Sequence, residues 1–339
     1  MAGCTVSTEY ARRGIDVVYL ENDHLRVEVL AGKGGDVTEL RDKRTDTDLM
    51  FEVPYEWHAP EDGYVGSPDS TFAYMDHYPG GWQNVAPSAG GPASVQGAEF
   101  GLHTGSALSP WDVIVEKEGP ERAAVRLSLS MTRYPLAMER RLILHADEAG
   151  LRVEDKMTNK GETTVPYSWL QHVVFGSAFL GPGCTVDVPC ETVLVDPQQD
   201  AQNARFESET EHDWPMAKTV DDDLVDLRSP PPKDERVHDL LALTDLQADH
   251  YTVRDPDLNL STRVSFPSDL YEYVWYWGAF GGFEKAPFFG RSYSLGLEPC
   301  TSIPNAGLDS ATESETANYL APAETVTADI TVETGTADD

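Results

Sequence analysis

Short apolar runs separated by turn residues fill this chain, and no window repeats its apolar residues at the spacing of a long helix. Such runs are typical of β-strands, because the side chains of a strand alternate between two faces. We expect strands at residues 16–20, 25–30, 111–116, 123–130, 137–145, 151–157, 185–188, 192–195 and 258–266. The pattern therefore predicts an all-β fold, with one weak helical candidate at residues 234–243.

The organisation of the chain favours one domain. A length of 339 residues allows one large domain or two ordinary ones, but we find no internal repeat and no linker. Residues 54–100 and 197–235 have the composition of long loops, and we interpret the second as a solvated acidic excursion. We expect a single domain over residues 1–339 with an ordered core over about 15–331, a last strand at 323–330 and a frayed end from Val332.

The charge of the chain is strongly negative, with 58 acidic against 25 basic residues and a formal net charge of −33. The acidic residues are spread along the chain and lysine is scarce, with 8 Lys against 17 Arg, which is typical of halophilic proteins. High salt screens the self-repulsion of such a surface. The same charge argues against a nucleic-acid partner and against binding to an anionic membrane.

The four cysteines, Cys4, Cys184, Cys190 and Cys300, form no CxxC pair and have no metal-finger spacing. We expect free thiols in a reducing compartment and no metal site. The first residues lack the apolar stretch of a signal peptide, and no run of about 18 apolar residues predicts a membrane-spanning helix. The predicted location is the cytoplasm.

Two ionisable residues stand in apolar surroundings. His172 lies within the apolar and aromatic run 165–180, and Glu298 follows the strand-like run 293–297. A buried imidazole or carboxylate is costly unless it has a partner or a use. The simpler alternatives are a core histidine bonded to a backbone carbonyl and a glutamate that faces solvent at a strand end. His103, beside Gly105, is equally compatible with an ordinary surface histidine.

The segment Gln171-His172-Val-Val-Phe-Gly-Ser-Ala-Phe-Leu180 resembles the active-site strand of the galactose mutarotase-like (aldose 1-epimerase) family. The run that ends in Leu-Glu298 is similar to a late strand of that family, and Phe100-Gly-Leu-His103-Thr-Gly105 resembles its His-Gly loop, with Thr104 inserted. The resemblance implies a large antiparallel β-sandwich, often called a supersandwich. It also implies that His172 is the general acid, that Glu298 is the general base, that His103 binds a sugar oxygen, and that neither a metal nor another cofactor takes part.

Further substrate-binding candidates come from the same resemblance. The family's Asn-Arg pair is replaced here by Trp82-Gln83-Asn84, so Gln83 or Asn84 is expected to supply the hydrogen bonds of the missing arginine. Trp82, Trp275 and Trp277 are candidates for a flat wall under a sugar ring, with core packing as the alternative, expected for at least one of Trp275 and Trp277. Arg291, which precedes the Glu298 strand, is a weaker candidate for contact with substrate.

The function that the resemblance implies is an aldose 1-epimerase-like isomerase, whose partner is a free sugar or sugar acid; a homodimer stays open. A non-catalytic carbohydrate-binding protein of the same fold is one alternative. A hexose-6-phosphate 1-epimerase is another, disfavoured by the scarcity of basic residues. A glycosidase normally needs two facing carboxylates, and Glu298 alone has a suitable setting. A lyase acting on a polyanion would be repelled by this acidic chain.

Overall fold

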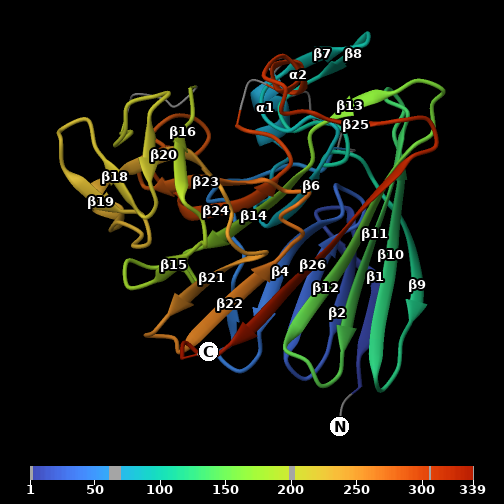
Figure 1. The fold of residues 1–339 in the computed structure, drawn as a ribbon. Helices are drawn as coiled ribbons and strands as arrows, with labels where there is room; N and C mark the ends of the chain where they lie inside the picture. Colours follow the sequence, from blue (N-terminus) through green and yellow to red (C-terminus); the bar gives the residue numbers. More distant parts are fainter. Residues whose placement is uncertain (1–2, 61–69, 198–202, 305–306, 339) are drawn as a thin grey trace.

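The computed structural model describes residues 3–60, 70–197, 203–304 and 307–338, in which two large antiparallel sheets form a β-sandwich (Figure 1). The twelve-stranded sheet contains, in spatial order, β1 (Thr5–Arg12), β2 (Ile15–Glu21), β3 (Leu25–Leu30), β4 (Asp36–Asp42), β6 (Trp82–Val85), β14 (Leu170–Gly176), β24 (Tyr293–Cys300), β23 (Tyr273–Phe280), β20 (Val237–Thr244), β16 (Thr192–Val195) and β17 (Glu211–Asp213), with β5 (Thr47–Asp48) beside β4. Its central strands therefore come from distant parts of the chain.

The eight-stranded sheet contains, in spatial order, β15 (Thr185–Asp187), β21 (His250–Asp255), β22 (Leu260–Ser265), β26 (Thr325–Gly335), β12 (Gly150–Asn159), β11 (Leu136–His145), β10 (Arg122–Ser130) and β9 (Asp112–Lys117). Three two-stranded sheets are formed by β7 (Ala93–Val95) with β8 (Ala98–Phe100), β13 (Val165–Tyr167) with β25 (Asn318–Leu320), and β18 (Met216–Lys218) with β19 (Leu224–Asp226). The short helices are α1 (Ser70–Met75), α2 (Leu308–Glu313) and the 3-10 helix η1 (Lys233–Glu235).

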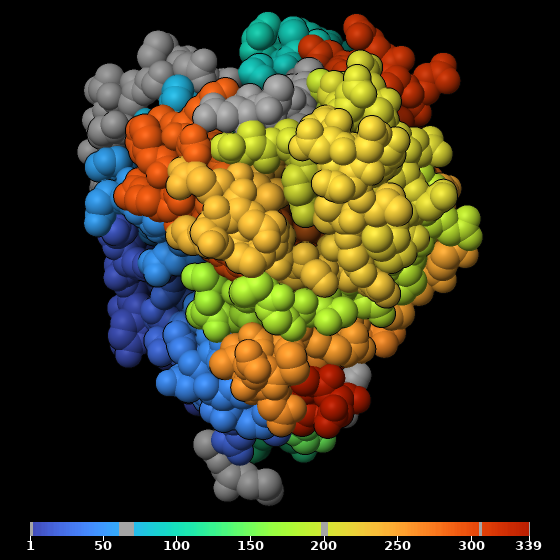
Figure 2. All heavy atoms as spheres, turned by 90° about the vertical axis from the view of Figure 1, so that its left-hand side faces the viewer, coloured from blue at the N-terminus to red at the C-terminus, as the bar shows by residue number. Residues whose placement is uncertain are grey.

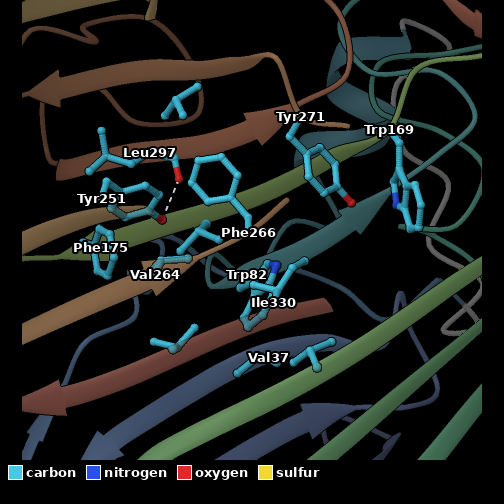
Figure 3. Packing of buried hydrophobic residues seen from close by; sticks show 14 of the residues in the cluster. Val37, Trp82, Trp169, Phe175, Tyr251, Val264, Phe266, Tyr271, Leu297 and Ile330 are labelled. Carbon is cyan, nitrogen blue, oxygen red and sulfur yellow. Dashed lines mark hydrogen bonds between the residues drawn. The ribbon is translucent and has the colours of Figure 1, made fainter. Parts of the chain in front are cut away.

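The main core fills the space between the two sheets, as Figure 3 shows for part of it. Alternate residues of each strand point into this space, as the period of two requires. Tyr251 of β21 crosses the core and donates a hydrogen bond of 2.8 Å to the carbonyl oxygen of Leu297 (Figure 3). The second sheet thereby holds β24 in place next to Glu298.

A buried ion pair within the eight-stranded sheet also contacts the twelve-stranded sheet. Arg140 of β11 donates two hydrogen bonds, of 2.9 and 3.0 Å, to the carboxylate of Asp155 on β12, and both side chains are fully buried. Arg140 also donates to the side-chain oxygen of Gln171 on β14, at 2.8 Å. The cost of burying the charges is offset by these bonds, and β14 is fixed against the opposite sheet by a directional contact.

A second apolar cluster covers the outer face of the large sheet. It contains the alternate residues of the central strands, such as Leu170 and Val174 of β14 and Trp275 of β23, together with Tyr74 and Tyr78 from α1 and the loop that follows it. The central strands are thus covered on both faces. This explains why β14 and β24 read as nearly continuous apolar runs, since every residue in them is buried.

The strand predictions are largely confirmed, and each of the nine expected segments coincides with a strand to within a few residues. The helix expected at 234–243 is wrong: only η1 is helical, and β20 lies between β16 and β23 with its apolar residues buried on both faces. The predicted loops at 54–100 and 197–235 contain α1, β6 to β8 and β17 to β19. These strands are short and partly polar, so they lack a clear period.

The predicted limits of the ordered core are too narrow. β1 begins at Thr5, and β26 continues to Gly335. Val332, the expected start of a frayed end, is buried and pairs with Leu151 on one side and Val264 on the other. All four cysteines are buried free thiols. In the part of the chain that the structure describes, no helix has both the length and the apolar character needed to cross a membrane.

Candidate functional site

His172 and Glu298 face each other on neighbouring strands at the centre of the large sheet. The pairing of β14 with β24 places Leu170 opposite Cys300 and Val174 opposite Gly296, so His172 and Glu298 hold the facing positions between them. Their side chains point to the outer face of the sheet, where Nε2 of His172 lies 3.5 Å from Oε1 of Glu298. The fold therefore brings together the two residues that the sequence singled out.

The pair lies at the floor of a cavity of about 350 Å³. Strands β14, β24, β23 and β20 supply the floor, and α1, the loop around Gly90 and residues near Asp196 and Phe283 supply the walls. Figure 2 shows the face of the molecule on which the segments that contain β16 and β20 lie, and β20 contributes to the cavity floor. The volume lies within the usual range of small-molecule sites, about 300 to 1,000 Å³.

Burial changes the acidity of both members of the pair. Desolvation raises the pKa of Glu298 well above its ordinary value. Desolvation lowers the pKa of His172 well below its ordinary value, and the nearby His103 makes a smaller contribution in the same direction. Both directions favour the neutral form, because a charge loses its hydration in the cavity wall. A pair of this kind shares its protons and titrates as a unit.

His103 also lines the cavity, next to His172, with 5.3 Å between the two ring centroids. Its Nδ1 accepts a hydrogen bond of 3.1 Å from the backbone N–H of Gly90, so the proton of the neutral ring is on Nε2. Desolvation lowers the pKa of His103 to about 4, which keeps the ring neutral at neutral pH. His103 can therefore act as a hydrogen-bond donor toward a ligand oxygen.

Two stacked tyrosines form part of the wall, and the sequence analysis did not single them out. The rings of Tyr74 and Tyr78 lie 5.4 Å apart, and Tyr78 meets His172 edge to face at 5.6 Å. The hydroxyl of Tyr74 donates to the side-chain oxygen of Gln83, whereas the hydroxyl of Tyr78 is buried and has no partner among the described residues. The only signal in the sequence is the aromatic content of the segment that was interpreted as a loop.

Two tryptophans of β23, Trp275 and Trp277, line the cavity from the same face of the strand. Trp275 is nearly buried and donates to the carbonyl oxygen of Ser302 at 2.7 Å. Trp277 is less buried and donates to Nε2 of His238 at 3.2 Å. His238 was also missed, because its segment was predicted as a helix rather than as strand β20. These rings provide a flat apolar surface in the cavity wall.

Three of the residues predicted to contact substrate lie outside the cavity lining because they are buried on β6. Trp82 and Asn84 point into the core between the sheets, where Trp82 donates to Gln171 at 2.8 Å and Asn84 accepts from Trp169 at 2.6 Å. Gln83 points outward, but Tyr74 covers it, and its amide group donates to Asp36 at 2.9 Å. These three positions do not favour direct contact with a ligand.

Arg291 also lies outside the cavity lining, in a separate surface recess with Arg13 and Trp57. Its guanidinium donates to three backbone carbonyls, those of Pro54, Pro287 and Phe288, at 2.7, 2.8 and 3.0 Å. These bonds hold two loops together. The structure therefore assigns Arg291 a position in loop packing instead of the predicted contact with substrate.

The cavity has no lysine or arginine side chain in its wall. All 25 Lys and Arg residues of the sequence fall within the described ranges, and none of them lines the cavity. Lys33 lies nearby, but it is fully buried and is paired with Asp36. Among the described residues, no group of three or more His, Cys, Asp or Glu side chains is placed to hold a metal ion. The cavity is thus suited to an uncharged, hydroxyl-rich ligand.

Comparison with solved structures identifies proteins with a similar fold. A candidate aldose 1-epimerase from Klebsiella pneumoniae matches with a TM-score of 0.72 and 14% identity, over 97% of this chain and 82% of that one. A galactose mutarotase-like protein from Clostridium acetobutylicum matches with a TM-score of 0.64 and 13% identity, over 98% and 99%. The Slr1438 protein from Synechocystis sp. PCC 6803 matches with a TM-score of 0.66 and 20% identity, over 99% and 100%. At these identities the likeness concerns the fold, and it confirms the predicted galactose mutarotase-like β-sandwich.

Comparison of sequences identifies the family. No curated protein matches the chain. Residues 12–334, which include every strand from β2 to β25 and most of β26, match the profile of one family. The chain belongs to the family described as a domain of unknown function (DUF4432).

Proposed function

We propose that this chain is an aldose 1-epimerase-like isomerase that interconverts the α and β anomers of an uncharged sugar by acid–base ring opening. The observation that carries the proposal is the buried pair of His172 and Glu298, 3.5 Å apart at the floor of the cavity. Mutarotation needs one group to remove a proton from a hemiacetal and another to supply one. Positioned acid–base groups contribute on the order of 10² to 10⁴ in rate each.

In the proposed reaction the pair carries one proton in total. Glu298, as the carboxylate, takes the proton of the anomeric hydroxyl, while protonated His172 gives its proton to the ring oxygen. The bond between the anomeric carbon and the ring oxygen breaks, its electron pair goes to the ring oxygen, and an aldehyde forms. After rotation about the bond between C1 and C2, the same steps run backwards on the other face of the carbonyl group.

The pKa shifts of His172 and Glu298 favour the protonation states that the pair reaches when the sugar ring is open. Ring opening leaves Glu298 protonated and His172 neutral, and burial favours these same forms by raising the pKa of Glu298 and lowering that of His172. Burial therefore favours the transfer of both protons during ring opening, while it makes the starting form, with Glu298 ionised and His172 protonated, the less populated one. Preference for the high-energy species over the substrate is what accelerates a reaction.

The walls favour an uncharged sugar. Neutral His103 offers a donor, and Trp275 and Trp277 offer an apolar face. A sugar phosphate or sugar acid would have to leave water without a cation to receive its charge, since no Lys or Arg of this chain lines the cavity. This disfavours a hexose-6-phosphate epimerase. A cytoplasmic location is part of the proposal, because the four thiols are unpaired.

The test is anomer interconversion, measured by NMR saturation transfer in molar KCl over a panel of neutral aldoses, sugar acids and sugar phosphates. We expect at least one neutral aldose to equilibrate faster with the wild type, and we expect His172→Asn and Glu298→Gln to abolish the effect. His24→Asn and Glu207→Gln, at exposed positions, are the matched controls and should keep the full rate.

Two results would redirect the proposal. Saturable sugar binding without any acceleration would favour the alternative of a carbohydrate-binding protein, in which His172 holds a ligand. Acceleration limited to sugar phosphates would contradict the preference expected from the uncharged walls and support the phosphate-specific alternative.

A further inference from the structure

Three neighbouring residues of the cavity lining each have a buried polar atom without a hydrogen bond. These atoms are the hydroxyl of Tyr78, Nδ1 of His172 and Oε1 of Glu298. Buried polar atoms in folded proteins nearly always have partners, so such exceptions require an explanation. The proposed reaction accounts for the two atoms of the acid–base pair. A fourth such atom in the lining, the hydroxyl of Tyr276, lies near Arg205 and Asp239, so the Tyr78 hydroxyl is left to be explained.

Tyr74 and Tyr78 have similar surroundings, but they differ in the hydrogen bonding of their hydroxyl groups. The two tyrosines are stacked, are equally buried and line the same cavity. The Tyr74 hydroxyl donates to Gln83, and Gln83 is held in turn by Asp36. The hydroxyl of Tyr78 has no such acceptor among the described residues, although the neighbouring Tyr74 hydroxyl has one in Gln83.

The position of Tyr78 is fixed by its backbone. Its N–H donates to the carbonyl oxygen of Met75 at 3.3 Å, and Gly80 pairs with Glu52 just beyond it. Gly80 has φ of +95°, and a Cβ there would lie 2.0 Å from the carbonyl oxygen of Phe51, so only glycine allows this close approach of the turn to the segment of Phe51. The hydroxyl is therefore presented from a rigid support, as a preorganised donor requires.

We propose that Tyr78 is a further catalytic residue, whose hydroxyl donates a hydrogen bond to the ring oxygen of the sugar as the bond from that oxygen to the anomeric carbon breaks. The inference rests on the proposed function, and it assigns a third group to the same reaction. The rings of Tyr78 and His172 meet edge to face at 5.6 Å, so Tyr78 lies beside the group that protonates this oxygen.

The step balances without a further reactant. The electron pair of the breaking bond moves to the ring oxygen, and the proton that this oxygen receives comes from His172. Tyr78 keeps its own proton and only donates a hydrogen bond, so its contribution is greatest while the oxygen carries negative charge. Burial raises the pKa of Tyr78 well above its ordinary value, which keeps the hydroxyl protonated throughout.

The experiment compares the wild type with Tyr78→Phe in anomer interconversion and in thermal unfolding, both in molar KCl. We expect kcat to fall on the order of 100-fold, as for loss of one preorganised donor, with KM changed only a few-fold. We expect Tm to stay the same or rise, because the substitution removes a hydroxyl that has no partner in the protein.

Two matched variants complete the design. Tyr134→Phe removes another buried hydroxyl, which donates to the Pro166 carbonyl oxygen at 2.6 Å outside the cavity, and it should leave the rate unchanged. Tyr74→Phe deprives Gln83 of its donor and should lower Tm, in contrast to Tyr78→Phe.

The outcomes separate this inference from the proposed function. If the wild type accelerates a sugar and Tyr78→Phe does so equally well, the role of Tyr78 is refuted and the proposed function stands. If Tyr78→Phe loses rate together with a fall in Tm like that of Tyr74→Phe, the hydroxyl supports the fold and the inference is wrong. If the wild type accelerates no sugar, the proposed function fails and this inference fails with it.

Discussion

Gly296 leaves the space that the carboxyl group of Glu298 occupies. The two residues lie two apart on β24 and share the outer face of the sheet, and a Cβ on Gly296 would lie 2.1 Å from Oε1 of Glu298. Real Cβ atoms do not come this close to another heavy atom, so any larger residue at position 296 would displace the carboxyl group from its position opposite His172. The glycine is thus a positioning residue for the acid–base pair.

We predict that Gly296→Ala lowers the proposed epimerase activity by about 100-fold or more, since small displacements of a catalytic group have effects of this size. The fold should persist, because Gly296 has an ordinary φ and alanine is compatible with a strand. Gly181→Ala is the control, since a Cβ there meets nothing within 4 Å and its φ is also ordinary. Full activity of Gly296→Ala would contradict this role, because it would show that the carboxyl group of Glu298 functions equally well in a displaced position.

The pH dependence of the rate should report the shared proton of the pair. Below the pKa of His172, which burial places well under its ordinary value, the pair gains a second proton and loses its base. Above the pKa of Glu298, which burial places well over its ordinary value, the pair loses its last proton and its acid. We therefore expect kcat/KM to be flat around neutral pH and to fall on both sides.

A pH profile of kcat/KM in molar KCl checks this prediction. His24→Asn, which changes an exposed histidine, should leave the profile unaltered. An acid limb centred on the ordinary pKa of histidine, about 6.5, would mean that His172 titrates as a solvated group, contrary to its burial.

The buried pair of Arg140 and Asp155 is predicted to matter far more to stability than an exposed pair of the same charges. Both side chains are fully buried, so Asp155→Asn leaves the guanidinium without its counter-charge and should destabilise the protein by about 3 to 5 kcal/mol. Asp329→Asn breaks a surface contact with Arg152, where the side chains are 49% and 68% exposed, and should cost less than about 1 kcal/mol.

Urea unfolding in molar KCl measures both free energies of unfolding under the same screening. Similar losses in the two variants would indicate that the buried ion pair of the eight-stranded sheet contributes no more to stability than a solvated one. The comparison also tests whether the position of β14 depends on Arg140, because Arg140 donates a hydrogen bond to Gln171, the residue that precedes His172 on this strand.

The strand pattern predicted the all-β fold class, whereas the pairing of His172 with Glu298 was implied by the resemblance to the galactose mutarotase-like family. Strands leave a period of two or a buried apolar run, so most of them were recognised. His172 and Glu298 were recognisable because an ionisable residue inside an apolar run is costly and therefore unusual. Their contact depends on the pairing of β14 with β24, which apolar patterns alone do not specify.

The rest of the site could not be predicted because it depends on which way each side chain points. Trp82, Gln83 and Asn84 are consecutive on β6, and only the register of that strand decides that none of them reaches the cavity. Tyr78 lies in a Gly- and Pro-rich segment without a period, so its place beside His172 follows from tertiary contacts alone. His238 was hidden by the wrong assignment of β20.

The last prediction concerns salt. At molar KCl the Debye length is about 3 Å, against about 30 Å at 10 mM, so repulsion among surface charges almost vanishes. Salt also weakens exposed ion pairs, such as that of Arg12 with Glu52, but each of these contributes little. With 58 acidic and 25 basic residues, most acidic side chains have no basic partner, so the loss of repulsion outweighs the loss of ion pairing. Tm should therefore rise steeply from 50 mM to 2 M KCl, and cooperative unfolding should be lost in dilute buffer.

A charge variant separates this effect from a general effect of salt on burial. Five exposed acidic residues lie close in sequence, and the variant changes all of them to their amides: Glu207, Glu209, Glu211, Asp221 and Asp223. It should melt higher than the wild type in dilute buffer and approach it in 2 M KCl, because the repulsion that it removes is already screened there. A wild-type Tm that does not depend on KCl would refute the halophilic interpretation of the surface, and equal salt slopes for the two proteins would show that the acidic charges are not its cause.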